Sequence, residues 1–581
     1  MSTHTEATFT GAPVKRLRLE SGKQPRTWLT HGRSYFLIIG IALVAGVASL
    51  STPTTPSYDP WCWIIWGREI LHGQLHLTNG ASWKPLPVLF TTPFALFGES
   101  APNLWVAVAR TGFIVVLLMG VKLSWRLTLM LAPTRSGAGL SEKLVRYAPA
   151  FAAAAATVIG IAVFGPWQSD SLLGYSEGVA VAALLIAFER HIDGHRRQAF
   201  AIGLLVALDR PETWLFWGLY GLWLMWRDPG SRKVVIGVAV LCLLLWFPPQ
   251  KWGGGSWFAG LSRAQQVRAN SPALAHDPFG TEMTSAWRML ALQINWGAIL
   301  VGSAALILLL AGVVISRRAK RANDTRSQRR TRDAEPSGLF VGTQRQALGA
   351  TLALTLFGFL WLGLIALMTQ LGFSGNNRYL VLGVAAINVA GGIFIGALAM
   401  AAGRLGGRFL PATRLRFLRA LLVLAAALGA VALFLFVPTW FGKSMSSLPR
   451  LRHIQLYQAQ LRTDVKDGIA KLGGPEAISK CGAGNFMIEG FQVPMAAWYL
   501  HRSIDETEAQ PAGYQPPPNL AWPNVIMQMA STRSAPDLPW WSMINGWKQN
   551  GAKYKVIQLP ASRVFEDCSF QPNAVPAESS L

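Results

Sequence analysis

Residues 57–112 read SYDPWCWIIWGREILHGQLHLTNGASWKPLPVLFTTPFALFGESAPNLWVAVARTG, and this stretch decides the class of fold that we expect. An apolar run precedes it at 35–51, and another begins inside it at 103–122. Tryptophans and prolines alternate with ionisable side chains, which are Asp59, Arg68, Glu69, His72, Lys84, Glu99 and Arg110. The pattern predicts an amphipathic helix followed by a Trp-Lys-Pro turn at a membrane surface.

The rest of the chain has the composition of a membrane protein. It is 51% hydrophobic and only 14% charged, whereas soluble domains carry about 25% charged residues. Runs of roughly membrane-spanning length occur at 35–51, 103–122, 147–165, 176–189, 199–208, 213–226, 234–248, 292–315, 347–371, 379–402 and 419–438. We therefore expect a polytopic all-α membrane protein with about eleven transmembrane helices. The short run 199–208 ends at Asp209-Arg210-Pro211-Glu212, which predicts a bent or partial helix buried in protein.

The net charge of +24 is explained by membrane topology. With the tail 1–34 inside the cell, 31 of the 53 Lys and Arg residues fall in the segments that alternate to the inside, as short cytoplasmic loops require. Nucleic acid is therefore not an expected partner. The basic loop 316–346 is expected to approach anionic membrane lipids. The run Tyr35–Leu50 also resembles a secretory signal, but its length favours an uncleaved anchor.

The predicted domains follow from these spans. Residues 35–438 form the transmembrane domain, with outer loops at 51–102 and 249–291. From 439 to 581 proline and polar residues return, and no further span occurs. This predicts an extracytoplasmic C-terminal domain of α/β or mixed structure.

Two features of the C-terminal domain carry predictions. Its two cysteines, Cys481 and Cys568, are expected to form a disulfide in an oxidising environment, with two buried thiols as the alternative. Its tryptophans suit either a glycan surface or core packing. They are Trp498, Trp522, Trp540, Trp541 and Trp547.

The order of the polar pieces resembles the GT-C glycosyltransferases. These polytopic enzymes use sugars carried on polyprenyl phosphates, and they include protein O-mannosyltransferases, lipid A aminoarabinose transferases and actinobacterial arabinofuranosyl- and mannosyltransferases. The matching pieces are Asp59, WKPLP at 83–87, LFG at 96–98, Arg110, LDRPETW at 208–214 and GNNRYLV at 375–381. Their order and common outer placement carry the resemblance, which covers the membrane part of the chain. It implies a GT-C-like fold and a polyprenyl-phosphate-linked sugar as partner.

Transfer from a lipid phosphate needs a base for the acceptor hydroxyl and cations for the departing phosphate. Asp59 is the candidate base, and Lys84, Arg210 and Arg378 are the candidate phosphate-binding residues. Displacement with a single carboxylate would invert the anomeric centre. No nucleotide-binding loop is found in the sequence.

Each of these residues also has a structural interpretation. Asp59 before a proline is typical of a helix N-cap. Lys84 can extend along the interface to reach water, and Arg378 can anchor the span that follows it. Arg210 with Glu212 can form an ion pair that seals a broken helix.

Further residues are candidates for the acceptor site or for support of the active site. Glu69 and His72 lie one helical turn apart. They could support the active site or bind a metal, and the alternative is that they form a solvated helix face. Asp170 and Glu177 flank an outer helix end, where they line a cavity or are ordinary loop carboxylates.

The long outer loop 249–290 is a candidate lid or binding element. Its tryptophans Trp252 and Trp257 would then meet substrate, and disorder of the loop is the alternative.

Taken together, the sequence predicts an inverting glycosyltransferase that moves a sugar from a polyprenyl-phosphate donor to an envelope glycan, lipid or protein. The reaction is placed on the outer face of a bacterial cytoplasmic membrane, and the Arg- and Ala-rich composition favours a bacterium of high GC content. A divalent cation stays open as a cofactor. A lipid-linked sugar transporter or flippase and a noncatalytic envelope-assembly scaffold are the alternatives.

Overall fold

The structure is a computed structural model, and it describes residues 28–132, 140–162, 165–267, 271–289, 342–409, 424–425, 428, 439–509, 524–529 and 552–569. The predicted span 292–315 lies outside the described residues. Residues 316–341 of the predicted loop 316–346 lie outside them too. So do most of the span 419–438 and the tail before residue 28. Trp522, Trp540, Trp541 and Trp547 lie outside them as well.

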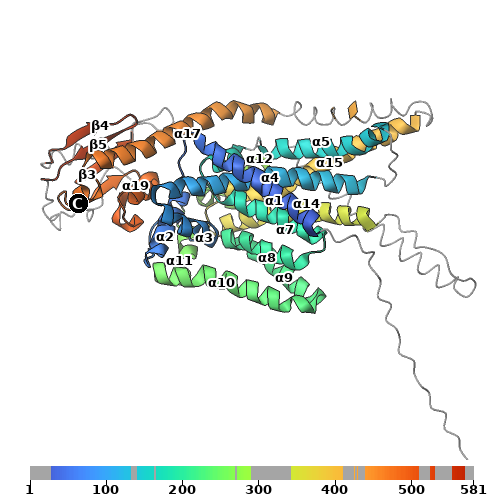
Figure 1. Cartoon of the computed structure of the whole chain (residues 1–581), viewed down its shortest axis with the longest axis horizontal. Helices are drawn as coiled ribbons and strands as arrows, with labels where there is room; N and C mark the ends of the chain where they lie inside the picture. Colours follow the sequence, from blue (N-terminus) through green and yellow to red (C-terminus); the bar gives the residue numbers. More distant parts are fainter. Residues whose placement is uncertain are drawn as a thin grey trace, which may run out of the picture.

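The described membrane part consists of helices that lie roughly along one long axis (Figure 1). They are α1 (Trp28–Ala48), α2 (Tyr58–Leu71), α3 (Pro85–Phe94), α4 (Ala101–Leu131), α5 (Leu140–Ala162), α6 (Gly165–Leu172), α7 (Glu177–Ile192), α8 (Arg196–Asp209), α9 (Trp214–Arg227), α10 (Arg232–Gly254), α11 (Ala259–Ala264), α12 (Pro278–Met289), α14 (Gly342–Gln370) and α15 (Val381–Phe409).

Six helical stretches among the described residues are long and apolar enough to cross a bilayer. They are Ser34–Ser51, Pro85–Leu131, Val145–Ala162, Pro229–Gly254, Thr343–Gln370 and Asn377–Ala401. Three other predicted spans correspond to α7, α8 and α9, which have 16, 14 and 14 residues. At about 1.5 Å per residue these helices are shorter than the roughly 30 Å of hydrocarbon, so they are partial spans. The predicted helix break is confirmed, because α8 ends at Asp209 and a 3₁₀ turn (Pro211–Thr213) precedes α9.

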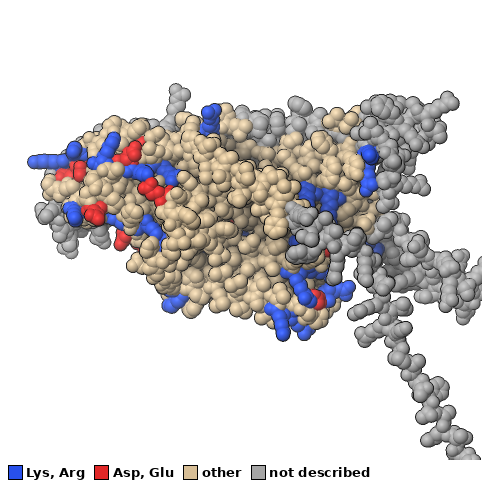
Figure 2. Space-filling view, in the orientation of Figure 1, with Lys and Arg blue, Asp and Glu red and all other residues tan. Residues whose placement is uncertain are grey.

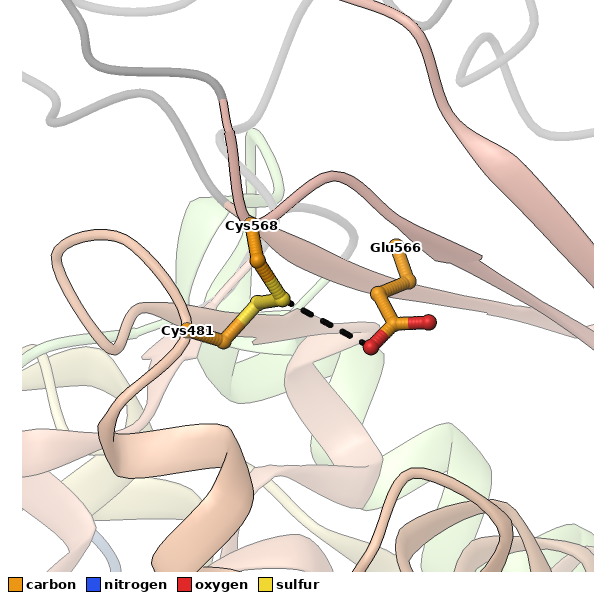
Figure 3. Close-up of side chains that lie close together, drawn as sticks. All are labelled: Cys481, Glu566 and Cys568. Atoms are coloured by element: carbon orange, nitrogen blue, oxygen red, sulfur yellow. Dashed lines mark hydrogen bonds between the residues drawn. A yellow bond between two sulfur atoms is a disulfide. The ribbon is translucent and has the colours of Figure 1, made fainter.

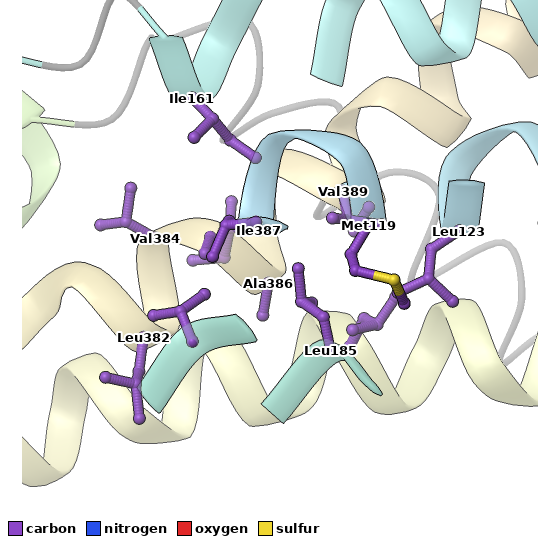
Figure 4. Close-up of a cluster of buried hydrophobic side chains, with 14 of the residues drawn as sticks. Met119, Leu123, Ile161, Leu185, Leu382, Val384, Ala386, Ile387 and Val389 are labelled. Carbon is purple, nitrogen blue, oxygen red and sulfur yellow. The ribbon is translucent and has the colours of Figure 1, made fainter. Parts of the chain in front are cut away.

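The membrane core packs α4, α5, α7 and α15 together. Figure 4 shows its side chains, which come from these four helices: Met119, Leu123, Ile161, Leu185, Leu382, Val384, Ala386, Ile387 and Val389. Helices α5 and α15 approach closely, since a Cβ on Gly392 would lie within 3 Å of the Ala153 carbonyl oxygen. Small residues allow this contact in the way usual for membrane helices.

The surface has the charge distribution of a membrane protein. On the face in Figure 2, Lys, Arg, Asp and Glu gather at the two ends of the long axis, and the broad middle is almost free of them. Large apolar side chains are exposed on the helices of this middle part, among them Leu37, Val44, Leu219, Leu243 and Leu360. Exposure of so much apolar surface to water would be unfavourable, and these helices are therefore suited to lipid. The chain is a polytopic helical membrane protein.

The C-terminal part is a small mixed α/β unit. Its five strands have the order β2-β1-β3-β5-β4, with β1 parallel to β2 and β3, and with β5 antiparallel to β3 and β4. The elements are α17 (Thr439–Lys471), α18 (Pro475–Ser479), β1 (Phe486–Ile488), α19 (Val493–Tyr499), β2 (Glu508–Ala509), β3 (Val525–Met529), β4 (Lys555–Gln558) and β5 (Ser562–Glu566). The long helix α17 runs from above the membrane helices to the sheet (Figure 1).

This unit packs against helix α2 of the loop that follows the first predicted span. Trp61 of α2 belongs to the same buried apolar cluster as Val465 of α17 and Trp498 of α19. The Arg68 guanidinium at the end of α2 donates to the carbonyl oxygens of Trp498 (3.0 Å) and Arg502 (2.5 Å). The aromatic helix of the first outer loop therefore supplies part of the core of the C-terminal unit. Buried Trp498 has a packing role in this core.

Cys481 and Cys568 form a disulfide that joins the end of α18 to the residues after β5 (Figure 3). Glu566 Oε1 lies 3.6 Å from Cys568 Sγ. These three side chains are also the only group of three or more potential metal ligands within 4.8 Å of one another in the described part of the chain. Both sulfur atoms belong to the disulfide, so this group offers no thiolate to a metal.

Candidate active site

Asp59 lies in the first turn of α2 and pairs with Arg378. Helix α2 begins at Tyr58 with Ser57 as its N-cap, so the N-cap interpretation of Asp59 is wrong. Its Oδ2 atom lies 2.6 Å from Nη2 of Arg378, and both side chains are about 15% exposed. The candidate base and one candidate phosphate-binding residue are thus ion-pair partners.

Arg378 sits in the 3₁₀ turn Asn377–Leu380 that leads into α15. Its guanidinium lies over the ring of Tyr175, at 4.6 Å from the centroid, and over Tyr379 at 5.5 Å. Its Nη1 atom is buried and has no hydrogen-bond partner among the described residues. These contacts hold the Arg378 side chain among Asp59, Tyr175 and Tyr379.

Lys84 is the N-cap of α3, with extended backbone because Pro85 follows it. Its side chain is buried, and its Nζ atom lies 3.4 Å from Glu177 Oε1 and 3.6 Å from Asp209 Oδ1. Lys84 therefore points into the protein, and the interpretation that it reaches for water is wrong.

Arg210 also precedes a proline and has extended backbone at the break between α8 and α9. Its Nη2 atom makes a short contact with Glu177 Oε1, and its Nη1 lies 4.0 Å from Glu212. The predicted Arg210–Glu212 pair is present, but Glu177 is the closer partner. The guanidinium also lies 4.2 Å from the Tyr379 ring, which connects it to Arg378.

Asp170, on α6, is a further carboxyl group close to Glu177, Arg210 and Arg378. Burial, followed by the nearby charge of Glu177, raises the pKa of Asp170 to about 8. Its Oδ2 atom is buried without a hydrogen-bond partner among the described residues. Asp170 is therefore mostly protonated at neutral pH.

A cavity of about 380 Å³ adjoins the buried charges. One end is ionic and carries Lys84, Asp209, Arg210 and Glu212, whereas the remaining wall is mostly apolar. The other lining residues are Ser82, Trp83, Pro211, Trp214, Trp246, Phe247, Gln250, Phe258, Gly260, Leu261, Ala264, Ile365, Met368, Thr369, Phe373, Ser374 and Tyr379. Such a shape suits an amphiphile with an anionic head.

The four central candidates are connected but do not all line this cavity. Lys84 and Arg210 line it directly, and Tyr379 both lines the cavity and contacts Arg378, the ion-pair partner of Asp59. Glu177 joins the two cavity cations. The structure thus places all four candidates, with Asp170 and Glu177, in one charged cluster.

Other candidates lie elsewhere. Glu69 is buried and accepts a hydrogen bond from the His76 backbone, whereas His72 is exposed and bonds to the Arg68 carbonyl. The two side chains neither form a pair nor share a solvated face. Trp252 and Trp257 are about half exposed and do not line the cavity, although the outer loop contributes other residues to it.

Asp209 was not among the predicted site residues, and its buried carboxylate has no hydrogen bond to the described residues. Its place at the end of a short apolar helix before Arg-Pro-Glu was the available signal. The cavity carboxylates do not form a close group of three metal ligands in the described part of the chain.

Comparisons with known proteins give two similar structures. No protein-family model matches the chain, and no curated protein matches it. The crystal structure of ArnT from Cupriavidus metallidurans in the apo state has a TM-score of 0.46 and 12% identity, covering 92% of this chain and 98% of that chain. The structure of the same protein bound to undecaprenyl phosphate has a TM-score of 0.45 with the same identity and coverage. At this identity and with TM-scores below 0.5, these similarities assign neither a family nor an activity to the chain.

Proposed function

We propose that this protein is an inverting glycosyltransferase of the GT-C type. It transfers a sugar from a polyprenyl-phosphate donor to a glycan, lipid or protein of the cell envelope, on the outer face of the bacterial cytoplasmic membrane. The observation that carries the proposal is the cavity whose ionic end holds Lys84 and Arg210 and whose remaining wall is apolar. A phosphate bound to a hydrocarbon chain has the complementary distribution of polarity.

The two cations of the cavity, Lys84 and Arg210, are paired with buried carboxylates. Glu177 and Asp209 form ion pairs with Lys84 and Arg210. Without these partners the two cations would be buried unpaired charges, which is energetically unfavourable. A phosphate that enters the cavity takes over part of these contacts, and the guanidinium of Arg210 provides two parallel donors for it. The cations then stabilise the charge that develops on the departing phosphate.

Asp59 is the proposed general base. Arg378 binds Oδ2 and fixes the orientation of the carboxylate, so Oδ1 is the oxygen proposed to accept the proton. The acceptor oxygen attacks the anomeric carbon, the bond from this carbon to the phosphate oxygen breaks, and polyprenyl phosphate leaves. The hydroxyl proton passes to Asp59, and one displacement inverts the anomeric centre.

The distribution of basic residues supports the outward orientation of the cavity. Helix α7 begins at Glu177 beside the cavity and ends near a second network, in which Glu189 pairs with Lys122 and Arg126. The network and the basic segments around it lie at the opposite ends of α4 and α7. Short basic segments favour the cytoplasmic side, which leaves the cavity outside.

The second solved structure contains undecaprenyl phosphate, which is a lipid carrier of the class that the proposed donor would release.

A transporter of lipid-linked sugars is the second candidate function. The break between α8 and α9, with Asp209 and Arg210 at the cavity, is the kind of broken helix that lines transport sites. A scaffold for envelope assembly is the third, and no single contact favours it.

The test uses the purified full chain in nanodiscs with a mixed pool of polyprenyl-phosphate sugars and an envelope extract. We expect glycan product with the wild type, a loss with Asp59→Asn, and no loss with Asp467→Asn, an exposed matched control on α17. Equal product from wild type and Asp59→Asn would contradict catalysis. Sugar-lipid translocation in proteoliposomes without product would favour the transporter.

A further inference from the structure

Two carboxylates line the ionic end of the cavity on either side of Arg210 in the sequence. Asp209 is the last residue of α8, and Glu212 lies in the 3₁₀ turn that follows. Both oxygens of Asp209 and the Oε2 atom of Glu212 are buried without a hydrogen-bond partner among the described residues. We infer that these oxygens accept hydrogen bonds from hydroxyl groups of the transferred sugar, which itself carries no carboxylate. The inference rests on the proposed function and extends it to the class of sugar.

Asp209 lies directly beside both cations that are proposed to bind the phosphate. Its Oδ1 atom is 3.6 Å from Lys84 Nζ, and its Oδ2 atom is 3.9 Å from Arg210 Nε. Both distances are longer than a hydrogen bond, so Asp209 attracts these cations by charge and keeps its capacity to accept hydrogen bonds. The sugar is joined to the phosphate through a single oxygen atom. A phosphate held by Lys84 and Arg210 therefore brings the sugar hydroxyl groups next to Asp209.

Most other polar groups of the cavity wall are already bonded to the protein. The indoles of Trp83, Trp214 and Trp246 each donate to a backbone carbonyl oxygen. The side-chain amide of Gln250 bonds to backbone groups through both its nitrogen and its oxygen, and the Thr369 hydroxyl donates to a backbone carbonyl. Among the described residues that line the cavity, the buried acceptors without a hydrogen bond are all carboxylate oxygens. The cavity therefore needs hydrogen-bond donors from its ligand.

The chemistry of these acceptors selects the ligand. An ionised carboxylate only accepts hydrogen bonds, so the oxygens of a phosphate diester or of an acidic sugar cannot satisfy it. Sugar hydroxyl groups can, and hydrogen bonds to an ionised acceptor are about twice as strong as those between neutral groups. A uronic acid would place another carboxylate beside Asp209 and Glu212, where burial strengthens the repulsion between like charges. The unit that fits is a sugar with free hydroxyl groups and no acidic group.

The experiment measures the binding of undecaprenyl-phosphate sugars to the full chain in nanodiscs. The neutral sugars are mannose, glucose and arabinofuranose, and galacturonic acid is the acidic one. Undecaprenyl methyl phosphate is the reference, because it has the same phosphodiester charge and no sugar. We expect the wild type to bind one neutral sugar-lipid at least about tenfold more tightly than the reference, since each hydrogen bond to a carboxylate adds affinity. The galacturonic acid lipid should bind no more tightly than the reference.

Asp209→Asn separates sugar binding from a role as counter-ion alone. The amide keeps the size of the side chain and removes its charge, so the preference for the neutral sugar-lipid over the reference should fall about tenfold. A mere counter-ion would change the affinity for both lipids by the same factor and leave the preference as it was. Glu212→Gln should lower the preference as well. Asp467→Asn, exposed on α17, is the matched control and should change neither affinity.

Three results would overturn the inference while leaving the proposed function in place. The first is equal affinity of the wild type for the neutral sugar-lipids and the reference, and the second is tightest binding of the galacturonic acid lipid. The third is an unchanged preference in every cavity variant that still binds the reference. Failure of the wild type to bind any of these lipids, or undecaprenyl phosphate itself, would instead remove the proposed function, and the inference with it.

Discussion

The Oδ2 atom of Asp59 lies 2.6 Å from Nη2 of Arg378, although the two residues are more than 300 positions apart in the sequence. The contact joins the first turn of α2 to the turn before α15. The candidate base and its guanidinium partner therefore form one ion pair, and this pair lies close to the cations of the cavity.

Because the two residues act together, their substitutions should not be additive. Asp59→Asn, Arg378→Gln and the double variant should each lower the rate of product formation by about 10²- to 10⁴-fold, with similar losses in all three. Steady-state rates of glycan formation measure this. Losses that multiply in the double variant would show that the residues act independently.

Removal of Lys84 should destabilise the protein, since Glu177 and Asp209 would keep buried charges without this partner. Lys84→Met should lower the free energy of unfolding by about 3–5 kcal/mol. Lys466→Met, which breaks the exposed pair with Glu99, is the control and should cost about 0–1 kcal/mol. Unfolding followed by tryptophan fluorescence in detergent compares the two, and equal losses would contradict the buried network.

Asp170 should make stability depend on pH. Burial raises its pKa to about 8, so between about pH 4 and pH 8 the folded state binds more protons than the unfolded state. Stability therefore falls as pH rises through this window. Asp170→Asn removes the effect and should raise Tm more at about pH 8 than at about pH 5. Equal changes at both pH values would contradict the raised pKa.

The disulfide should stabilise the C-terminal unit by closing a long loop. Cys481 and Cys568 are separated by 87 residues, which in the chain-entropy model corresponds to about 4.6 kcal/mol. A reducing agent should lower the Tm of the wild type and leave the Cys481→Ala, Cys568→Ala double variant unchanged. A wild type insensitive to the reductant would show that the bond contributes little.

The sequence predicted the helical membrane architecture, and it also selected several of the ionisable residues that the structure brings into one cluster. Apolar run lengths and basic loops specify the spans, and the prolines after Lys84 and Arg210 specify where their helices begin or end. The pairing of Asp59 with Arg378 could not be predicted in this way, because a pattern along the chain does not say which outer loops meet.

The C-terminal unit shows the same limit. The tryptophans of α2 were predicted to lie on an amphipathic helix, but their burial against Val465 and Trp498 depends on contacts across some 400 residues. Asp209 was missed for a related reason. A single acidic residue at a helix end has an ordinary local role, and only the fold brings it to Lys84.

The central claim is that the ionic end of the cavity binds a polyprenyl phosphate. The direct measurement is photolabelling of the full chain in nanodiscs by undecaprenyl phosphate carrying a photoactivatable group beside the phosphate, with peptides identified by mass spectrometry. We expect labels in residues 82–84 and 209–214. Excess unlabelled lipid phosphate should remove these labels, and the neutral polyprenyl alcohol should not. Labels confined to the outer faces of α1 and α10, or equal competition by the alcohol, would contradict it.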